Sequence, residues 1–481
     1  MANFYKPNTS SKALTKSIQQ LRISGVDHFG SGISSDLNKV IFVSNALPGE
    51  FVEAEVVSGK GVASQANVLK IIEPSEQRTT PFCQHFEQCG GCQTQYCDAH
   101  AMLGYKQQAV DSMILHTTAI EAAKNKPIKK GSLSARRPKA AKSITIKDIV
   151  GQLPWEAAIH SEGQRYRYKT RLAVDARNPN DLRLGYRSRG SKNVFNLEAC
   201  PILVDELAAL IQPLQSVFQK LKQPNKIGHV SMVKGNDGVL VSIRIVKTLA
   251  SNDIQLLTDF AQQQAISLFL ETDSELINIS DKSATLQYSP SPDIALDMHI
   301  NDFVQVNNVV NQQMIKQAQD WLALEPNDSV LDLFCGIGNF SLPLAKHCKH
   351  VYGVEGVAKM VQRAQQNAHK NGLENCDFIQ ADLNEVKSLS KITQYQCNKV
   401  ILDPSREGAK QTIDALPKLK PTHILYVSCN PATFSRDAAG LLQQNYRLVK
   451  IGLMDMFPQT SHTELMALFM RSDYLTDTNG D

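Results

Sequence analysis

The second half of the chain is dominated by short apolar runs rich in β-branched residues, separated by segments with helical spacing. From about Asn301 onward these runs are SVLDLFC, HVYGVEG, CDFIQAD, KVILDPS, HILYVSC and YRLVKIGLMDMF. Strands that alternate with helices in this way predict a doubly wound α/β sheet. Ligands of such sheets bind beyond the carboxyl ends of the strands. We therefore expect residues 301–481 to form one domain whose site lies in the loops that follow these runs.

The N-terminal region has a different pattern. Residues 1–20 form a polar tail without the apolar core of a signal peptide. Residues 21–76 alternate apolar and polar positions between closely spaced turns, which predicts a small five-stranded antiparallel barrel of the OB type. Such barrels bind oligonucleotides or serve only as packing modules, and the pattern leaves both readings open. Residues 77–300 are expected to form a central β-rich domain.

Charge is unevenly distributed along the chain. The net charge is +4, yet the 24 residues from Lys124 to Lys147 carry nine basic and no acidic residues. Because this stretch also lacks an apolar face, an insertion at about 122–147 is expected to be disordered, either as a solvated loop or as a phosphate-binding arm. No apolar run is long enough to cross a membrane, so the chain is expected to be cytoplasmic without membrane partners.

A second basic stretch alternates cations with aromatic residues. Residues 165–189 contain Arg165, Arg167, Lys169, Arg171, Arg183, Arg187 and Arg189 together with Tyr166, Tyr168 and Tyr186. Alternation with period two places one set on one face of a strand. Arginines beside aromatic rings suit phosphate contacts and base stacking, although an ordinary solvated sheet face has the same pattern.

Five of the ten cysteines fall between residues 83 and 200. Cys83, Cys89 and Cys92 lie in one loop, 83–97, and Cys200 precedes a proline. Four thiolates can hold zinc or an iron–sulfur cluster, and spacing alone does not choose between them. Cys97 competes with Cys200 for the fourth position. The other cysteines, Cys335, Cys348, Cys376 and Cys397, are expected to be structural.

A glycine-containing loop follows the first apolar run of the C-terminal region. It reads Asp332-Leu-Phe334-Cys-Gly336-Ile-Gly338-Asn339 and is predicted to join a strand to a helix. A nicotinamide fingerprint needs a third glycine where this chain has Ser341. The acidic residue ahead of the glycines is instead similar to S-adenosylmethionine loops. In that interpretation Glu355 holds the ribose, Asp382 lies near the adenine and Asp403 closes the pocket.

A thiol and a carboxyl group complete the chemistry at the later strand ends. Cys429 follows the fifth run, where a nucleophile would be exposed, and Glu464 can act as a base. Addition of a thiolate to C6 of uracil makes C5 a carbon nucleophile that can accept a methyl group, after which a base removes the C5 proton. Taken alone, Cys429 could be inert packing and Glu464 a surface carboxylate.

Five motifs in order resemble the RNA uracil-C5-methyltransferase family. They are Phe303-Val-Gln305-Val-Asn307, the Asp332–Asn339 loop, Asp403-Pro-x-Arg406, Ser428-Cys429-Asn430-Pro431 and His462-Thr-Glu464. The resemblance implies Cys429 as nucleophile and Glu464 as base. It also implies that Gln305, Phe334, Asn339, Glu355, Asp382 and Asp403 line the site.

Within this family, the N-terminal barrel looks like a TRAM domain, and the cysteine set resembles that of the ribosomal-RNA branch. The resemblance therefore implies a [4Fe-4S] cluster on Cys83, Cys89, Cys92 and Cys200, and methylation of uridine 1939 in 23S rRNA by a monomer without an obligate protein partner. The alternatives are the same chemistry on tRNA or on another rRNA uridine, and a non-catalytic RNA-binding protein.

Overall fold

The computed structural model describes residues 15–124 and 153–477, apart from residue 38, residues 59–62 and 283–284, and parts of 386–393. Most of the basic insertion therefore lies outside the described residues. The chain divides into two compact units: residues 1–82, 92–109 and 459–461 form the first, and 83–91, 110–458 and 462–481 form the second. No helix in the described ranges is both long and apolar enough to cross a membrane.

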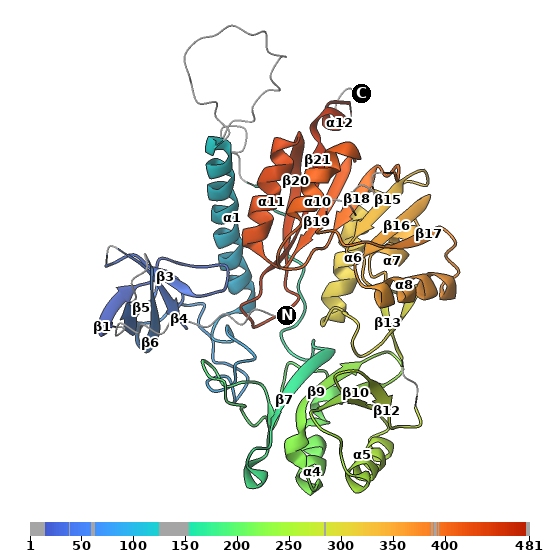
Figure 1. Cartoon of the computed structure of the whole chain (residues 1–481). Coiled ribbons are helices and arrows are strands. Elements are labelled where there is room, and N and C mark those ends of the chain that lie inside the picture. The colour runs from blue at the N-terminus through green and yellow to red at the C-terminus, as the bar shows by residue number, and fades with distance from the viewer. Residues whose placement is uncertain are drawn as a thin grey trace. The chain divides into compact units, whose positions relative to one another are not determined.

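The first unit is built on one six-stranded sheet, shown in blue in Figure 1. Its strands are β1 (Thr15–Arg22), β2 (Gly25–Val26), β3 (Gly32–Ser34), β4 (Val40–Ser44), β5 (Phe51–Ser58) and β6 (Ala63–Glu73). The strand order is β1-β5-β6-β4-β3-β2, and alternate residues such as Leu21, Val52 and Ala66 form its core. The helix predicted after the cysteine loop is present as α1 (Ala99–Lys124).

This sheet departs from the expected five-stranded antiparallel barrel. It has six strands, β4 runs parallel to β6, and β1 begins at Thr15 within the predicted tail. Period-two alternation specifies that a segment is a strand but contains no information about the direction of its neighbour, which is set by the connecting loops. The domain boundaries at 76 and 300, like the TRAM assignment, stay predictions.

The second unit contains a six-stranded sheet of order β12-β11-β10-β9-β7-β8. The strands are β7 (Lys169–Asp175), β8 (Arg183–Gly185), β9 (Ile227–Lys234), β10 (Val239–Ile245), β11 (Ser267–Glu271) and β12 (Leu276–Asn278). Its helices are α3 (Asp205–Ala208), α4 (Ile211–Lys220) and α5 (Ser251–Gln263), with 3-10 turns η1 (Pro179–Asp181) and η2 (Pro224–Lys226). A hairpin of β13 (Leu286–Ser291) and β14 (Ile294–Met298) follows.

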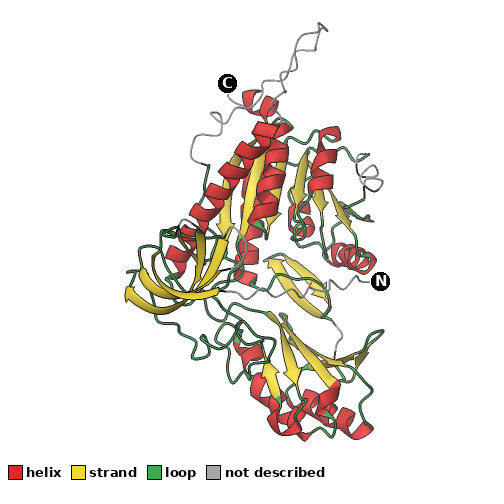
Figure 2. Ribbon diagram, turned by 60° about the vertical axis from the view of Figure 1, so that its left-hand side comes forward, coloured by secondary structure: helices red, strands yellow, loops and turns green. Residues whose placement is uncertain are grey.

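The same unit contains a seven-stranded sheet of order β17-β16-β15-β18-β19-β21-β20. Its strands are β15 (Ser329–Leu333), β16 (His350–Glu355), β17 (Cys376–Gln380), β18 (Lys399–Leu402), β19 (His423–Ser428), β20 (Tyr446–Met454) and β21 (Glu464–Arg471). Helix α6 (Asn308–Leu322) precedes β15. The helical segments between the later strands are α7 (Ser341–Ala345), α8 (Ala358–Lys370), α10 (Lys410–Ala415), η3 (Leu416–Lys418) and α11 (Pro431–Gln443), and Figure 2 shows helices packed along this sheet. A last helix, α12, spans Ser472–Asp477.

All six runs predicted as strands in the C-terminal region are confirmed. Every residue of β18 and β19 is buried, as expected for strands covered on both faces. The prediction omitted β21, which lies antiparallel between β19 and β20. A buried antiparallel strand reads as the same continuous apolar run as a parallel one, so ELMALFM was the signal that could have found it.

Candidate active site

The predicted site residues of the C-terminal region follow strands that end at one edge of the seven-stranded sheet. Strands β15 to β19 are parallel to one another, so their carboxyl ends coincide there. Phe334 follows β15, Glu355 ends β16, Asp403 follows β18 and Cys429 follows β19. Because β21 is antiparallel, its first residue, Glu464, lies at this same edge, which we call the carboxyl edge.

The glycine-containing loop has a constrained backbone. Phe334, Gly336 and Gly338 have positive φ angles of 69°, 58° and 96°. The amides of Phe334 and Cys335 both donate to the carbonyl of Val354 on β16, at 2.9 and 3.1 Å. A Cβ at Gly338 would lie 2.3 Å from Leu342 Cδ1, and L side chains rarely adopt its φ of 96°, so this position favours glycine.

Glu355 holds this loop through its half-buried carboxylate. Oε2 accepts from the amide of Gly336 at 3.2 Å, and Oε1 accepts from the amide of Val357 at 2.9 Å. Each carboxylate oxygen has a further lone pair. The group can therefore accept hydrogen bonds from two vicinal hydroxyls while it fixes the loop, which fits the predicted ribose contact.

The side chain of Asn339 forms hydrogen bonds with other residues of the protein. Its Oδ1 accepts from Tyr288 Oη at 3.0 Å and from Asn311 Nδ2 at 3.1 Å, while its Nδ2 donates to Asn311 Oδ1 at 2.9 Å. Tyr288 belongs to the β13–β14 hairpin and Asn311 to α6. The side chain predicted to line the cofactor site thus ties the glycine-containing loop to two other elements, and neither partner was predicted from the sequence.

Asp332 lies within β15 rather than at its end, and its side chain is wholly buried. Its Oδ2 accepts from Ser341 Oγ at 2.5 Å, while Oδ1 has no hydrogen-bond partner. Burial, opposed by the Ser341 hydrogen bonds, raises the pKa of Asp332 to about 7. Asp332 therefore supports the loop from beneath instead of facing a ligand.

Cys429 and Glu464 lie next to each other across neighbouring strands. Ser428, the last residue of β19, is paired with Leu465, which follows Glu464 in β21. Burial and the charges of Glu464 and Asp403 raise the pKa of the Cys429 thiol, whereas Arg406 lowers it. The thiol is half-buried, and the Glu464 side chain is almost fully buried. The predicted nucleophile and base are therefore together.

The carboxyl groups around Cys429 hold their protons unusually strongly. Burial, followed by the charges of Asp403 and Asp455, raises the pKa of Glu464 to about 8, against a smaller opposing effect of Arg406. Burial and Asp332 raise the pKa of Asp403 to about 7. Sequence reasoning missed Asp455, although an acidic residue directly after the apolar run of β20 was a usable signal.

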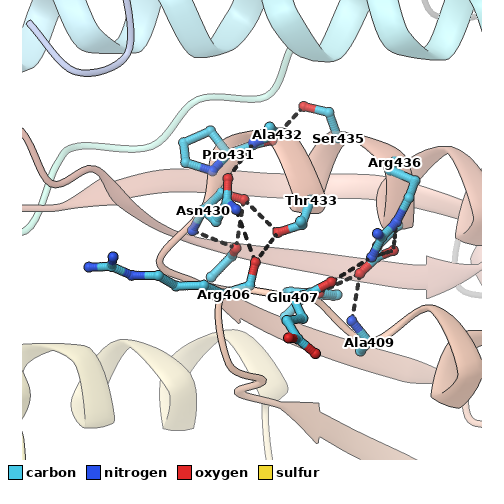
Figure 3. A network of polar contacts seen from close by, with 12 residues as sticks. Arg406, Glu407, Ala409, Asn430, Pro431, Ala432, Thr433, Ser435 and Arg436 are labelled. Atoms are coloured by element: carbon cyan, nitrogen blue, oxygen red, sulfur yellow. Dashed lines mark hydrogen bonds and ion pairs between the residues drawn. The ribbon is translucent and has the colours of Figure 1, made fainter. Parts of the chain in front are cut away.

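The segment from Asp403 to Ala409 is fastened to the start of α11 (Figure 3). The carbonyl of Arg406 accepts from Asn430 Nδ2 at 2.9 Å and from Thr433 Oγ1 at 3.3 Å. Asn430 Oδ1 also accepts from the amide of Ala432, which caps the helix. Because Cys429 directly precedes Asn430, this network fixes the nucleophile relative to the Asp403 segment.

Arg406 extends its guanidinium away from this network, as Figure 3 shows. Its Nη2 donates to His462 Nδ1 at 3.2 Å, and the imidazole stacks on Phe457 with centroids 4.7 Å apart. Arg406 and His462 both stand in the quoted motifs, but no role was predicted for either. Their contact holds a cation near Cys429 and Glu464.

The two remaining residues predicted to line the cofactor site are Gln305 and Asp382. Gln305 is half-buried in the loop between β14 and α6. Asp382 is exposed two residues after β17, and its Oδ1 accepts from the amide of Asn384 at 2.9 Å. The roles of both stay predictions.

Cys97, Cys335, Cys348, Cys376 and Cys397, the cysteines outside the expected cluster and the active site, are all buried. Within the second unit, the Cys83 thiol contributes to the raised pKa of Cys89, after burial. The thiols of Cys200 and Cys89 also raise the pKa of Tyr186, whose largest cause is again burial. Among the described residues, no group of three or more His, Cys, Asp or Glu side chains is arranged to hold a metal ion.

The structure corrects the predicted basic and aromatic face at residues 165–189. Tyr166 is buried, and its hydroxyl donates to the carbonyl of Pro458 at 3.0 Å. Arg167 donates to the carbonyl of Lys169 and lies 5.8 Å from the Phe457 ring. Period two cannot distinguish side chains that face solvent from those that another element covers, and here Tyr166 is covered and Arg167 half-buried, whereas Arg171 and Arg187 are exposed.

Known proteins match the chain along most of its length. The model of the tRNA (uracil-5-)-methyltransferase family matches residues 141–472. The 23S rRNA (uracil(1939)-C(5))-methyltransferase RlmD of Vibrio cholerae is 38% identical over 473 residues, which cover 98% of this chain and 100% of that protein. The protein of the same name from Shewanella sediminis is 37% identical, with coverages of 98% and 99%.

A solved structure has a similar fold. It is that of Pyrococcus abyssi tRNA (uracil-54, C5)-methyltransferase in complex with S-adenosyl-L-homocysteine, with a TM-score of 0.68. The similarity covers 94% of this chain and 99% of that one at 19% identity. It supports a mixed α/β multidomain fold with a Rossmann-like methyltransferase part.

Proposed function

This chain belongs to the tRNA (uracil-5-)-methyltransferase family, and from that premise we propose that it methylates C5 of uridine 1939 in 23S rRNA. The proposal is carried by the adjacent Cys429 and Glu464 at the carboxyl edge. The choice of 23S rRNA over tRNA is supported by the names of relatives that align with 98% of the chain.

The reaction needs a nucleophile, a methyl donor and a base. The Cys429 thiolate adds to C6 of the uracil, and the electron pair moves to C5 and O4. S-adenosylmethionine supplies an electrophilic methyl group, which C5 accepts, and S-adenosylhomocysteine is released. The Glu464 carboxylate then removes the C5 proton, the C5–C6 double bond forms again and the thiolate leaves. The target base has to be flipped out of its RNA fold for both faces to be reached.

The residues at the carboxyl edge fit this cofactor. Glu355 has lone pairs available for ribose hydroxyls, and the loop with Phe334 lies beside it. Asp403, with a pKa raised to about 7, would be stabilised in its charged form by the positive sulfonium. We propose Gln305 and Asp382 as further contacts in the same site.

The central test measures tritium release from RNA that carries [5-³H]uridine, with S-adenosylmethionine as donor. Wild-type protein should release tritium from protein-free 23S rRNA but not from tRNA, and a substitution of uridine 1939 should abolish the release. Release from tRNA alone would keep the chemistry and overturn the substrate. No release from either RNA, by protein that binds S-adenosylhomocysteine, would favour a non-catalytic RNA-binding protein.

We also propose that Cys83, Cys89, Cys92 and Cys200 hold a [4Fe-4S] cluster. The proposal is supported by their spacing and by the electrostatic interaction between the thiols of Cys83 and Cys89. Methyl transfer requires no redox step, so the cluster would have a structural role. Protein purified without oxygen should contain about four iron atoms and four sulfides. Cys200→Ser should lose them and the matched variant Cys97→Ser should keep them, whereas zinc in place of iron would overturn the assignment.

A further inference from the structure

Only part of the basic stretch 165–189 remains available to a partner. Arg165 is ion-paired with Asp205, with Nε and Oδ1 3.3 Å apart. Arg183 is paired with Asp181 at 2.5 Å, and the Arg189 guanidinium lies 4.5 Å from the Phe86 ring. Arg171 and Arg187, in contrast, are exposed; Arg187 Nη1 donates to the carbonyl of Lys192 at 2.5 Å, which leaves its charge without an acidic partner in that contact.

The sheet register brings a histidine from a distant segment to these two arginines. Ala173 on β7 pairs with His229 on β9 and with Gly185 on β8. Paired residues point to the same side of a sheet, as do residues two positions apart. Arg171, two residues before Ala173, and Arg187, two residues after Gly185, therefore share a side with His229. We call these three residues the basic face.

The opposite side of the same strands is core. Leu172, Leu184 and Val230 alternate with the basic face and have no exposed surface. Helices α4 and α5 lie on that side (Figures 1 and 2). The basic face lies on the other side of these strands, where Arg171 and Arg187 are exposed and His229 is half-buried.

The charges on this face are not balanced. Burial and then the charges of Arg171, Arg187 and Arg244 lower the pKa of His229, and only Glu271 opposes them. Arg244 is ion-paired with Glu271 at 3.8 Å and also with Asp273. Those two acidic groups thus offset the charge of Arg244. Arg171 and Arg187 remain as the excess positive charge, and the lowered pKa of His229 keeps its imidazole neutral.

Strand β7 also leads to the catalytic region. The amide of Tyr168 donates to the carbonyl of Val306 at 2.7 Å, and Lys169 Nζ donates to the carbonyl of Asp302 at 2.6 Å. Both acceptors flank the loop that contains Gln305. Arg171 follows Lys169 by two residues, about 7 Å along the strand, so a nucleic acid strand that enters the site can reach it.

We propose that Arg171, Arg187 and His229 form a binding site for the phosphate backbone of the substrate RNA. This inference rests on the proposed function and names the surface that positions the RNA beside the reacting base. Contacts to phosphates fix register and orientation but do not read sequence. The basic face should therefore contribute equally to target and non-target RNA.

The test compares Arg171→Gln with Arg177→Gln in the full-length protein. Arg177 is exposed two residues after the end of β7, and its guanidinium is paired with Asp175 at 2.6 Å. Affinity for a 23S rRNA fragment containing uridine 1939, and for an unrelated RNA of equal length, would be measured by fluorescence anisotropy over a range of salt concentrations.

Arg171→Gln should weaken binding of both RNAs by roughly 3–10-fold and reduce the salt slope by about 1, whereas Arg177→Gln should change neither. Tritium release should show a raised KM with kcat unchanged. Arg187→Gln should behave like Arg171→Gln, with iron content and S-adenosylhomocysteine binding retained.

Equal RNA affinities of Arg171→Gln and Arg177→Gln would contradict the proposed binding of RNA phosphates by the basic face. A loss of affinity in Arg171→Gln that is confined to the target RNA would contradict it as well. Wild-type protein that binds RNA yet releases no tritium would instead overturn the proposed function, and the binding comparison would still decide the role of the basic face.

Discussion

At the carboxyl edge of the seven-stranded sheet, buried carboxyl groups crowd one another, whereas at the amino edge a buried carboxylate has a full set of partners. At the carboxyl edge, burial and then the charge of Asp403 raise the pKa of Glu464, and burial and then the charge of Asp332 raise the pKa of Asp403. At the amino edge, Asp328 Oδ2 lies 2.7 Å from Lys399 Nζ. Lys399 also donates to two carbonyls at the end of α6, at 2.6 and 2.7 Å.

The difference shows which edge stabilises the fold and which performs chemistry. Burial opposes ionisation of Asp328, but hydrogen bonds from Lys399 and Asn398 lower its pKa below the ordinary value. The amino edge is therefore electrostatically satisfied. The carboxyl edge carries a repulsion that a cationic ligand such as a sulfonium would relieve, which is typical of functional sites.

The largest effect is expected for Cys429→Ala. Loss of the nucleophile should reduce tritium release on the order of 10³-fold or more, with little change in thermal stability because the side chain is half-buried. Cys397→Ala, which removes a buried thiol outside the carboxyl edge, should keep full activity per folded molecule. Retained tritium release in Cys429→Ala would disprove covalent catalysis.

Glu464→Gln is expected to have the second-largest effect. Its proton-abstraction step should slow by roughly 10²–10⁴-fold, so that a methylated RNA–protein adduct accumulates and is visible as a band of reduced mobility on a denaturing gel. The exposed Glu374→Gln serves as the matched control. Fast turnover without an adduct would assign proton removal to another group.

Lys399→Met tests how much the paired charges of the amino edge stabilise the fold. Removal of one partner leaves Asp328 buried and unpaired, which should cost about 3–5 kcal/mol and lower the Tm by on the order of 10 °C. Activity per folded molecule at 25 °C should not change. The control variant Lys418→Met, at an exposed residue, should leave both the Tm and the activity unaltered. An equal loss of Tm in both variants would show that the Asp328–Lys399 pair stabilises the fold no more than a surface lysine does.

The smallest effect is a difference in pH dependence. Glu464, with a pKa raised to about 8, holds more protons in the folded than in the unfolded state above pH 4.5, so its contribution to stability is lost as pH rises toward 8. Glu464→Gln and Asp403→Asn should therefore raise the Tm by a few degrees at pH 8 and by less at pH 5.

Asp328→Asn should behave in the opposite sense. Because the pKa of Asp328 is lowered, its stabilising contribution is complete above the ordinary value of 3.8 and is lost only as pH falls through the lower folded value. The cost of Asp328→Asn should thus stay constant from pH 5 to pH 8 in calorimetric scans. If the Tm changes of the variants at both edges varied with pH in the same way, the electrostatic difference between the carboxyl edge and the amino edge would be contradicted.

The sequence predicted those parts of the fold and site that depend on local pattern. Six of the seven strands of the C-terminal sheet, the glycine-containing loop and the places of Glu355, Asp403 and Cys429 after or at the ends of strands were all readable from apolar runs and turns. It missed the antiparallel β21 and the parallel pair of β4 and β6, because strand direction depends on segments far apart in the chain.

Chain polarity explains what the sequence by itself determined. Parallel strands joined by helices must end at the same edge, so residues that follow each strand are brought together whatever the packing details. Only the tertiary structure decided which charges are buried, which are paired and which stay open. The raised pKa of Glu464, the tie between Asn339 and Tyr288, and the meeting of His229 with Arg171 all depend on contacts between distant segments, and periodicity within one segment carries no information about them.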